Sequence, residues 1–229
     1  MAGRPRGVDD AAILRATGEV VGRVGPAGLT LAAVAREVGL VPGTLMQRFG
    51  SKRGLLLVFA ERAAESAEAE ARTAPERLRR AHGSALAALT ALLVESMEPM
   101  TTPETYANHL AFLCLDLGEP EFHAHALTVH RAERRAVEEL LTAAVAAGEL
   151  RAGTDVGPLA RSVQAMAGGA GLIWALDREG TLARRMRQEI GEVLARHLVR
   201  PVELPADLPV DLPADVPVGV LVPADQEES

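Results

Sequence analysis

The chain has 229 residues, 48% of them hydrophobic but only 3% aromatic, and a formal net charge of −7 at pH 7. A core made mostly of Ala, Leu and Val favours packed helices over sheets, and the length allows one or two domains. No apolar run approaches the roughly 18 residues that cross a bilayer, the start lacks a secretory signal, and the single cysteine excludes an internal disulfide, so we expect a cytoplasmic, all-α protein without a membrane partner.

Three short helices are predicted near the N-terminus. The first begins at Asp9 or Asp10, either of which can cap it. Its apolar residues recur at helical spacing and are Ile13, Leu14, Val20, Val21 and Val24. The sequence GPAG at 25–28 breaks this helix, and Thr30 caps a second helix that Gly39 closes. The third starts at Pro42, because proline at the first helical position has a suitable φ and loses only an unpaired amide hydrogen.

Longer helices are expected to follow. One runs to about Ala71, and Pro75 prevents it from continuing. Prolines and glycines then separate helices at 75–97, 103–117, 120–148, 155–178 and 181–199. The prediction is about nine helices, divided into a head of residues 1–54, a larger helical body of residues 55–200 and a tail of residues 201–229.

The tail repeats every four residues, with proline at 201, 205, 209, 213 and 217. Proline at this density forbids a helix. In an extended chain, where side chains alternate between faces, one edge of the tail is acidic and proline-rich and the other is wholly apolar. Two interpretations stay open. The tail is either disordered, or it is a strap that docks its apolar edge on the body or on a partner subunit.

The head has the charge and the helix order of a DNA reader. Residues 1–60 hold eight basic and four acidic side chains, which indicates a polyanionic partner there and not at the acidic body. Two short helices joined by a tight turn and preceded by a third match a helix-turn-helix, whose last helix enters the major groove of double-stranded DNA. Gly43 lets the backbone approach a phosphate. The side chains that can donate to bases or phosphates are Thr44, Gln47, Arg48 and Lys52.

The series TLAAVAREVGLVPGTLMQRFGSKRGLL, which begins at Thr30, resembles the DNA-binding domain of the TetR family of transcriptional regulators. In this register the family usually reads an Ala-rich helix ending in Gly, then Val-Ser-x-Gly-Thr-Leu-Tyr-x-His-Phe, then Ser-Lys and a Leu pair. The matching positions are Thr30, Ala35, Gly39, Gly43, Thr44, Leu45, Phe49, Ser51, Lys52, Leu55 and Leu56. The resemblance implies a helix-turn-helix domain followed by a helical effector-binding and dimerisation domain.

Three positions depart from the family pattern. Val41 stands where the family often has a capping Ser, so an N-cap hydrogen bond worth roughly 1 kcal/mol is missing. Met46 replaces a Tyr that commonly contacts DNA, and Arg48 replaces a His. Met46 has two open roles, DNA contact and core packing. The operator sequence therefore does not follow from the resemblance.

The N-terminal arm adds two candidates for DNA contact. Gly3-Arg4-Pro5-Arg6 resembles short arms that place arginine in an AT-rich minor groove, although a solvated terminus explains it equally well. With the arm included, the predicted DNA-binding residues are Arg4, Arg6, Thr30, Pro42, Gly43, Thr44, Met46, Gln47, Arg48 and Lys52.

The body is expected to form a homodimer. One recognition helix makes too few contacts for selective binding, so helix-turn-helix proteins usually dimerise on palindromic sites. The last two helices are the candidates for the interface, and the resemblance implies a four-helix bundle built from them. The predicted interface residues are Gly168, Gly169, Gly171, Ile190 and Leu194. Packing of these helices within one chain is the alternative.

The resemblance also implies that the body binds a small effector. A pocket with large side chains suits an apolar ligand that has one or two polar anchors. The predicted pocket residues are Met97, Tyr106, His109, Phe112, Phe122, Met166 and Trp174. Ordinary core packing is the alternative for each of them.

The sequence predicts no cofactor, metal site or catalytic group. His123 and His125 project about 200° apart on a helix, which opposes shared metal ligation, and His130 lies two turns from His123. Nucleophile-elbow, phosphate-loop and paired-cysteine motifs are lacking. The leading hypothesis is a homodimeric, effector-responsive transcriptional repressor. The alternatives are a regulator controlled by a protein partner without a small ligand, and an all-helical binding protein or enzyme.

Overall fold

The computed structural model describes residues 8–199, which form nine α-helices and no strand. The helices are α1 (Asp10–Gly28), α2 (Leu31–Glu37), α3 (Pro42–Phe49), α4 (Lys52–His82), α5 (Ala85–Glu95), α6 (Pro103–Gly118), α7 (Pro120–Ala146), α8 (Val156–Asp177) and α9 (Leu182–Ala195). The all-α prediction is therefore confirmed. The predictions for the tail at 201–229 and for the arm lie outside the described residues.

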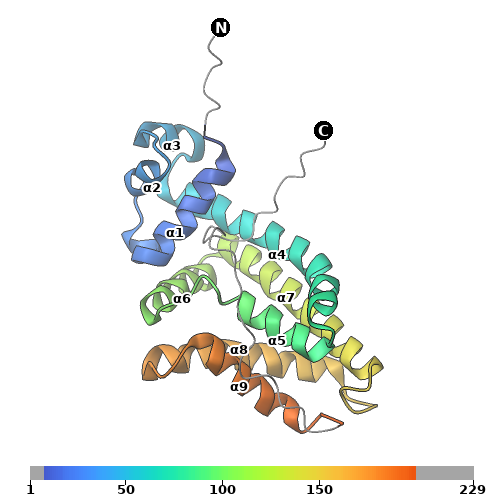
Figure 1. The fold of residues 1–229 in the computed structure, drawn as a ribbon. Coiled ribbons are helices and arrows are strands. Elements are labelled where there is room, and N and C mark those ends of the chain that lie inside the picture. The colour runs from blue at the N-terminus through green and yellow to red at the C-terminus, as the bar shows by residue number, and fades with distance from the viewer. Residues whose placement is uncertain (1–7, 200–229) are drawn as a thin grey trace.

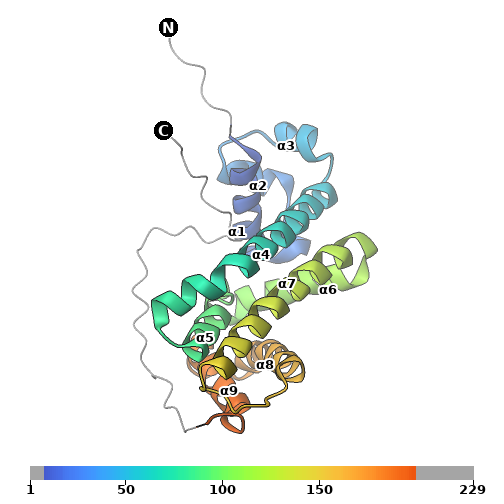
Figure 2. The same ribbon diagram turned by 90° about the vertical axis from the view of Figure 1, so that its right-hand side faces the viewer.

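The long helix α4 contacts α1 and α3 as well as α5 and α7. Helices α1, α2 and α3 lie together at one end of the molecule, and α8 and α9 lie at the opposite end (Figure 1). In the second view, α4 runs from the first group into the rest of the molecule alongside α7 (Figure 2). We call α1–α3 the head and α5–α9 the body, and α4 belongs to both.

The head is built from capped helices around a small apolar core. The side chain of Asp9 accepts a hydrogen bond from the amide of Ala12 at 2.8 Å, and that of Thr30 accepts one from Ala33 at 3.1 Å, so both predicted caps are present. The buried residues that join the three helices to α4 include Ile13, Val20, Val34, Leu45 and Leu55. Because burying one large aliphatic side chain contributes about 1.5–3 kcal/mol, this core holds α3 firmly against its neighbours.

Helix α1 is broken close to its end, as the GPAG sequence predicts. Gly25 has φ 71° and ψ 169°, a conformation outside the helix that glycine adopts readily. Pro26 follows it, and a short turn continues to Gly28. Val24, which was predicted to lie on the apolar face of the helix, is 44% exposed. The apolar face of α1 therefore ends before the break.

The prediction that a helix ends before Pro75 is wrong, because α4 continues through this proline to His82. Proline inside a helix costs about 3 kcal/mol. Here Pro75 is itself buried, and so are Ala74 and Leu78 beside it. Their burial in the body core offsets the cost. The helix ends instead at Gly83, whose φ of 67° is left-handed, and the side chain of Ser84 caps α5. The predicted helix at 75–97 is thus divided between α4 and α5.

The body has the larger core, enclosed by α4, α5, α7, α8 and α9. Its fully buried large side chains include Leu78, Leu89, Leu140, Leu141, Met186 and Ile190. A second, smaller group joins head and body, where Phe59 of α4, Phe112 of α6 and Phe122 of α7 stack edge to face. The apolar core of the head therefore extends through α4 to α6 and α7 of the body.

Candidate nucleic-acid interface

The predicted recognition helix α3 presents most of its length to solvent. Leu45 is fully buried and anchors the helix, while Met46 is 52% exposed. The residues of α3 that are exposed are Pro42, Gly43, Met46, Gln47 and Arg48, and Thr44 is half-buried. The sequence left open whether Met46 contacts DNA or packs in the core. Its exposure shows that its side chain does not belong to the head core.

The start of α3 has the features expected from its sequence. Pro42 occupies the first turn, and Val41 makes no side-chain capping bond. A β-carbon built on Gly43 would meet no atom within 4 Å. Packing inside the chain therefore does not require glycine at this position. Thr30, at the start of α2, is also exposed, although its hydroxyl is engaged as a cap.

Two predicted DNA-binding cations are bonded within the head. Lys52 Nζ donates to the carbonyl of Ala27, near the end of α1, at 2.8 Å. Arg48 donates from one guanidinium nitrogen to the carbonyl of Val8 at 2.8 Å and to Oδ1 of Asp10 at 3.0 Å. Both cations are therefore held in place before any DNA binds. Arg4 and Arg6 lie outside the described residues.

A polar contact between head and body was missed by sequence reasoning. Pro26 has no amide hydrogen, so the carbonyl of Gly22, four residues earlier, lacks its usual helical donor. Asn108 of α6 supplies the donor, with its Nδ2 at 2.8 Å from this oxygen. A β-carbon on Gly25 would lie 2.9 Å from Asn108 Oδ1, so the side chain fits against the break in α1. The sequence does contain a sign of this contact, because Pro26 predicts that the carbonyl of Gly22 has no helical donor and needs one from elsewhere.

A second contact between head and body is ionic. Arg53, at the start of α4, pairs with Glu119 and Glu121 at the start of α7, with N–O distances of 2.8 and 2.5 Å. The same guanidinium lies 5.4 Å from the centre of the Phe122 ring. These bonds raise the pKa of Arg53, which stays charged in any case. Phe122, one of the predicted pocket residues, is only 1% exposed and packs with the head core.

The other predicted pocket residues fall into separate places. Tyr106 and Trp174 are buried with their rings 6.4 Å apart, and His109 lies beside Tyr106. The Tyr106 hydroxyl donates to the carbonyl of Gly168 at 3.1 Å, and Trp174 Nε1 donates to that of Gly180 at 3.1 Å. Their polar atoms are thus already bonded. The half-buried residues Met97 and Met166 pack at the margin of the body core, and Phe112 belongs to the joint with the head.

One carboxyl group near the joint is unusual. Asp116, in the last turn of α6, is 9% exposed, and its Oδ1 has no hydrogen-bond partner among the described residues. Burial raises the pKa of Asp116 to about 7. The negative end of the α6 dipole also disfavours a carboxylate at this place. Asp116 therefore titrates near neutral pH, which its position in the sequence did not indicate.

The predicted dimer residues divide between surface and core. Gly168 and Gly169 lie on the exposed face of α8, with open space around them. A β-carbon on Gly171 would lie 2.4 Å from the Tyr106 ring, so this glycine serves packing inside the chain. Ile190 and Leu194 are at most 1% exposed. The apolar stripe of α9 that holds both residues faces the body core of its own chain, and a role of these residues in an interface stays a prediction.

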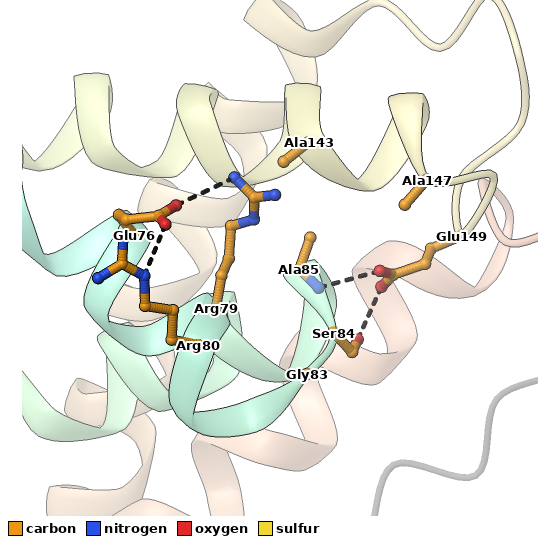
Figure 3. Close-up of a pocket in the computed structure, with 9 residues that line it drawn as sticks. All are labelled: Glu76, Arg79, Arg80, Gly83, Ser84, Ala85, Ala143, Ala147 and Glu149. Atoms are coloured by element: carbon orange, nitrogen blue, oxygen red, sulfur yellow. Dashed lines mark hydrogen bonds and ion pairs between the residues drawn. The ribbon is translucent and has the colours of Figure 1, made fainter.

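A recess of about 210 Å³ lies where the end of α4, the start of α5 and the end of α7 meet (Figure 3). It is lined by Glu76, Arg79, Arg80, Gly83, Ser84, Ala85, Ala143, Ala147 and Glu149. The Glu149 carboxylate accepts bonds from Ser84 and from the first amides of α5, and Glu76 pairs with the two arginines. Its charges are therefore matched within the chain, and none of the predicted pocket residues lines it.

Residues 8–199 contain no group of three or more His, Cys, Asp or Glu side chains placed to hold a metal ion. In the same described range, no helix is long and apolar enough to cross a membrane.

Structural comparison finds solved structures with the same fold as this chain. The repressor SmeT of the Stenotrophomonas maltophilia multidrug efflux pump aligns at a TM-score of 0.63 and 21% identity, covering 90% of this chain and 98% of that one. A putative regulator from Saccharomonospora viridis in complex with choline aligns at 0.65 and 20%, covering 83% and 97%. FadR from Bacillus subtilis in complex with stearoyl-CoA aligns at 0.61 and 15%, covering 82% and 98%. At these identities the alignments establish a shared fold.

Family models extend this result to the sequence. The model for bacterial regulatory proteins of the tetR family matches residues 13–59, the helix-turn-helix and the start of α4. The model for the tetracyclin repressor-like C-terminal domain matches residues 110–190. No curated protein matches the chain. The two models cover more than half of the chain, in the order and at the places where the fold has its head and body. The chain is therefore a DNA-binding transcriptional regulator, not an enzyme, and belongs to the TetR family.

Proposed function

We propose that the protein is an effector-responsive repressor that binds a palindromic operator as a homodimer in the cytoplasm. In this proposal residues 1–54 bind DNA, residues 55–200 bind the effector and dimerise, and the tail at 201–229 is accessory. The observation that carries the proposal is the exposed face of α3, where Gly43 has open space around it and Met46 is 52% exposed. The residues proposed to contact DNA are Arg4, Arg6, Thr30, Pro42, Gly43, Thr44, Met46, Gln47, Arg48 and Lys52.

The homodimer is supported by an apolar face on α8. Leu172, Ile173 and Leu176 are 45%, 49% and 72% exposed, and they follow Gly168 and Gly169 along the helix. A contiguous exposed apolar patch commonly marks a protein interface, and small residues next to it let two helices approach closely. A second copy of the chain, packed face to face, covers this surface in the proposed dimer. The two recognition helices are then related by a two-fold axis, as a palindromic site requires.

DNA binding is tested by selection from randomised duplex DNA with the full chain. The expected result is enrichment of a palindromic sequence whose half-sites lie about one helical turn, or a multiple of it, apart. Binding of that sequence should weaken steeply with salt, because each neutralised phosphate releases counterions. The substitution Gly43→Val, which adds a branched side chain where the backbone is proposed to meet DNA, should reduce affinity without changing the unfolding temperature. Enrichment of no palindrome at moderate salt would refute the proposal.

Dimerisation is tested by sedimentation of Leu176→Glu. This side chain is 72% exposed, so the substitution has little effect on the folded single chain but places a charge in the proposed interface. The expected result is a monomer at concentrations where the unaltered protein is a dimer. Val199→Glu, which also replaces an exposed aliphatic side chain but lies beyond α9, is the matched control. A variant that remains fully dimeric would place the interface elsewhere.

The effector is proposed to be a small apolar molecule bound in the body near Tyr106, His109 and Trp174. Support for an effector comes from two similar structures, which are complexes with choline and with stearoyl-CoA, and the large side chains at these three positions favour an apolar one. The test is a thermal-shift screen, because a ligand at 100 times its Kd stabilises the folded state by about 2.7 kcal/mol. A compound that stabilises the protein and also releases the DNA enriched by the selection supports effector control. The second candidate, control by a protein partner through the tail, is favoured if no compound stabilises the protein and truncation at residue 200 changes regulation.

A further inference from the structure

Val41, Pro42 and Met46 form an apolar surface at α3 that faces solvent. Met46 is 52% exposed, and Val41, which directly precedes the helix, is 68% exposed. Pro42 is exposed too, and it lies one turn before Met46 on the same side of the helix. Within residues 8–51, Val24 is the only other large apolar side chain that is exposed. The exposed apolar groups of the head are therefore concentrated at α3.

Packing within the chain does not account for this surface. Leu45, which is fully buried, anchors α3 in the head core, and neither Val41 nor Met46 belongs to that core. Val41 also occupies the N-cap position without making a side-chain bond to the helix. The neighbouring helices α1, α2 and α4 each have a capping Asp, Thr or Ser at this position. Val41 and Met46 thus add neither a cap nor a buried contact, and another molecule is needed to remove them from water.

The major groove of DNA offers one apolar group at its base edges, the C5-methyl of thymine. The base paired with thymine is adenine, whose N6 and N7 suit a Gln side chain, and Gln47 is exposed next to Met46. A phosphate is bound by a hydrogen-bond donor or a positive charge, and the thioether of Met46 supplies neither. Thymine is therefore the part of DNA that matches this apolar surface.

We propose that Met46 is a specificity-determining residue, which contacts the C5-methyl of one thymine in each half-site of the operator. The inference rests on the proposed DNA binding and names a base that α3 reads. The three rotatable bonds and the polarisable sulfur of methionine let its side chain adapt to a methyl group. Residues 8–60 hold six basic and four acidic side chains, and this excess of positive charge favours DNA over an apolar protein face as the occupant of the surface.

Replacement of thymine by uracil in the DNA isolates this contact. Uracil lacks the C5-methyl group but keeps the same base pairing and the same phosphate charge. A Met46 side chain that packs on the sugar–phosphate backbone is insensitive to the replacement, whereas one that packs on the methyl group loses its partner. The two kinds of contact are therefore separated by a change to a single group of the DNA.

The experiment measures Kd for the duplex enriched by selection and for versions in which one thymine of each half-site is replaced by uracil. The proteins are the full chain, Met46→Ala and Met46→Leu. At one thymine position, uracil in both half-sites should weaken binding by the full chain about 15-fold, because each buried methyl group contributes roughly fourfold. The same replacement should weaken binding by Met46→Ala less than about twofold, because the side chain and the methyl group are coupled. Met46→Leu keeps a large apolar side chain and should stay sensitive to uracil.

Two controls accompany these measurements. Val24→Ala shortens the other exposed apolar side chain of the head, 44% exposed on α1, and should leave the response to uracil unchanged. Met46→Ala should leave the salt dependence of Kd unchanged, because no phosphate contact is lost. Its unfolding temperature should also be unchanged, since the side chain is half exposed.

Three results would overturn the inference. One is equal weakening of the thymine and uracil duplexes by Met46→Ala, which would place Met46 on the DNA backbone. Another is unaltered affinity of Met46→Ala for DNA, which would leave the apolar surface to a protein partner. The third is a selected duplex in which uracil has no effect at any thymine position, and then only the role of Met46 fails. If selection enriches no duplex, the DNA-binding proposal and this inference fail together.

Discussion

The substitution Asn108→Ala tests how the body holds the head. The carbonyl of Gly22 has no helical donor because Pro26 lacks an amide hydrogen, and Asn108 Nδ2 donates to it at 2.8 Å. Removing the amide group deletes the only side-chain hydrogen bond that joins α6 to α1 within residues 8–199. It also leaves a space against Gly25, whose conformation accommodates the side chain.

The expected loss of stability follows from the bond and its environment. A typical intramolecular hydrogen bond contributes about 0.5–1.5 kcal/mol, and a buried acceptor left without a partner costs about 1–3 kcal/mol. The contact is partly buried, so Asn108→Ala should lower the free energy of unfolding by about 1–3 kcal/mol. For a chain of this size each kcal/mol changes the unfolding temperature by about 2–4 °C, which predicts a decrease of roughly 2–12 °C.

The assay combines urea unfolding with hydrogen exchange of the folded protein. Exchange should rise at the end of α1, around Gly22 and Leu29, more than in the α8–α9 pair. Gln188→Ala, on the exposed surface of α9, is the control and should change stability by less than about 0.5 kcal/mol. An Asn108→Ala protein that unfolds at the unaltered temperature, with unaltered exchange in α1, would refute the reasoning that α6 completes the broken helix.

Three other predictions concern the body. Gly171→Ala should destabilise the protein by about 1–3 kcal/mol through overpacking, because the added carbon would lie 2.4 Å from Tyr106. Gly157→Ala, in the same helix, is the control and should be neutral or stabilising by up to about 1 kcal/mol. Urea unfolding measures both changes. The pKa of Asp116 is raised from 3.8 to about 7. Between these pH values the folded state holds a proton that the unfolded state has lost. The free energy of unfolding therefore falls as pH rises through this window, by at most about 1.4 kcal/mol per pH unit. Asp116→Asn should remove that slope, and identical slopes in urea titrations from pH 4 to 8 would contradict the assignment. Glu149→Ala should cost about 1–3 kcal/mol by leaving the first amides of α5 unpaired, and Glu149→Gln should cost less, since it keeps an acceptor.

The sequence alone determined the features that depend on neighbouring residues. The caps at Asp9 and Thr30, the break at Gly25 and the start of α3 at Pro42 are all present where the residue types predict them. Each depends on a hydrogen bond or a backbone angle within a few residues, so local chemistry is sufficient. The helix-turn-helix pattern and the family resemblance are local in the same way, which is why both were visible before the fold was known.

Only the tertiary structure determined which face of each helix is buried and which residues cover it. Pro75 stays inside α4 because its neighbours are buried, Ile190 and Leu194 face the core of their own chain, and Phe122 packs with the head core. Helical periodicity identifies an apolar stripe but not the surface that covers it, because that surface comes from residues far away in the chain. The bonds of Asn108 to Gly22 and of Arg48 to Val8 connect such distant residues, and only packing energy summed over the whole molecule selects them.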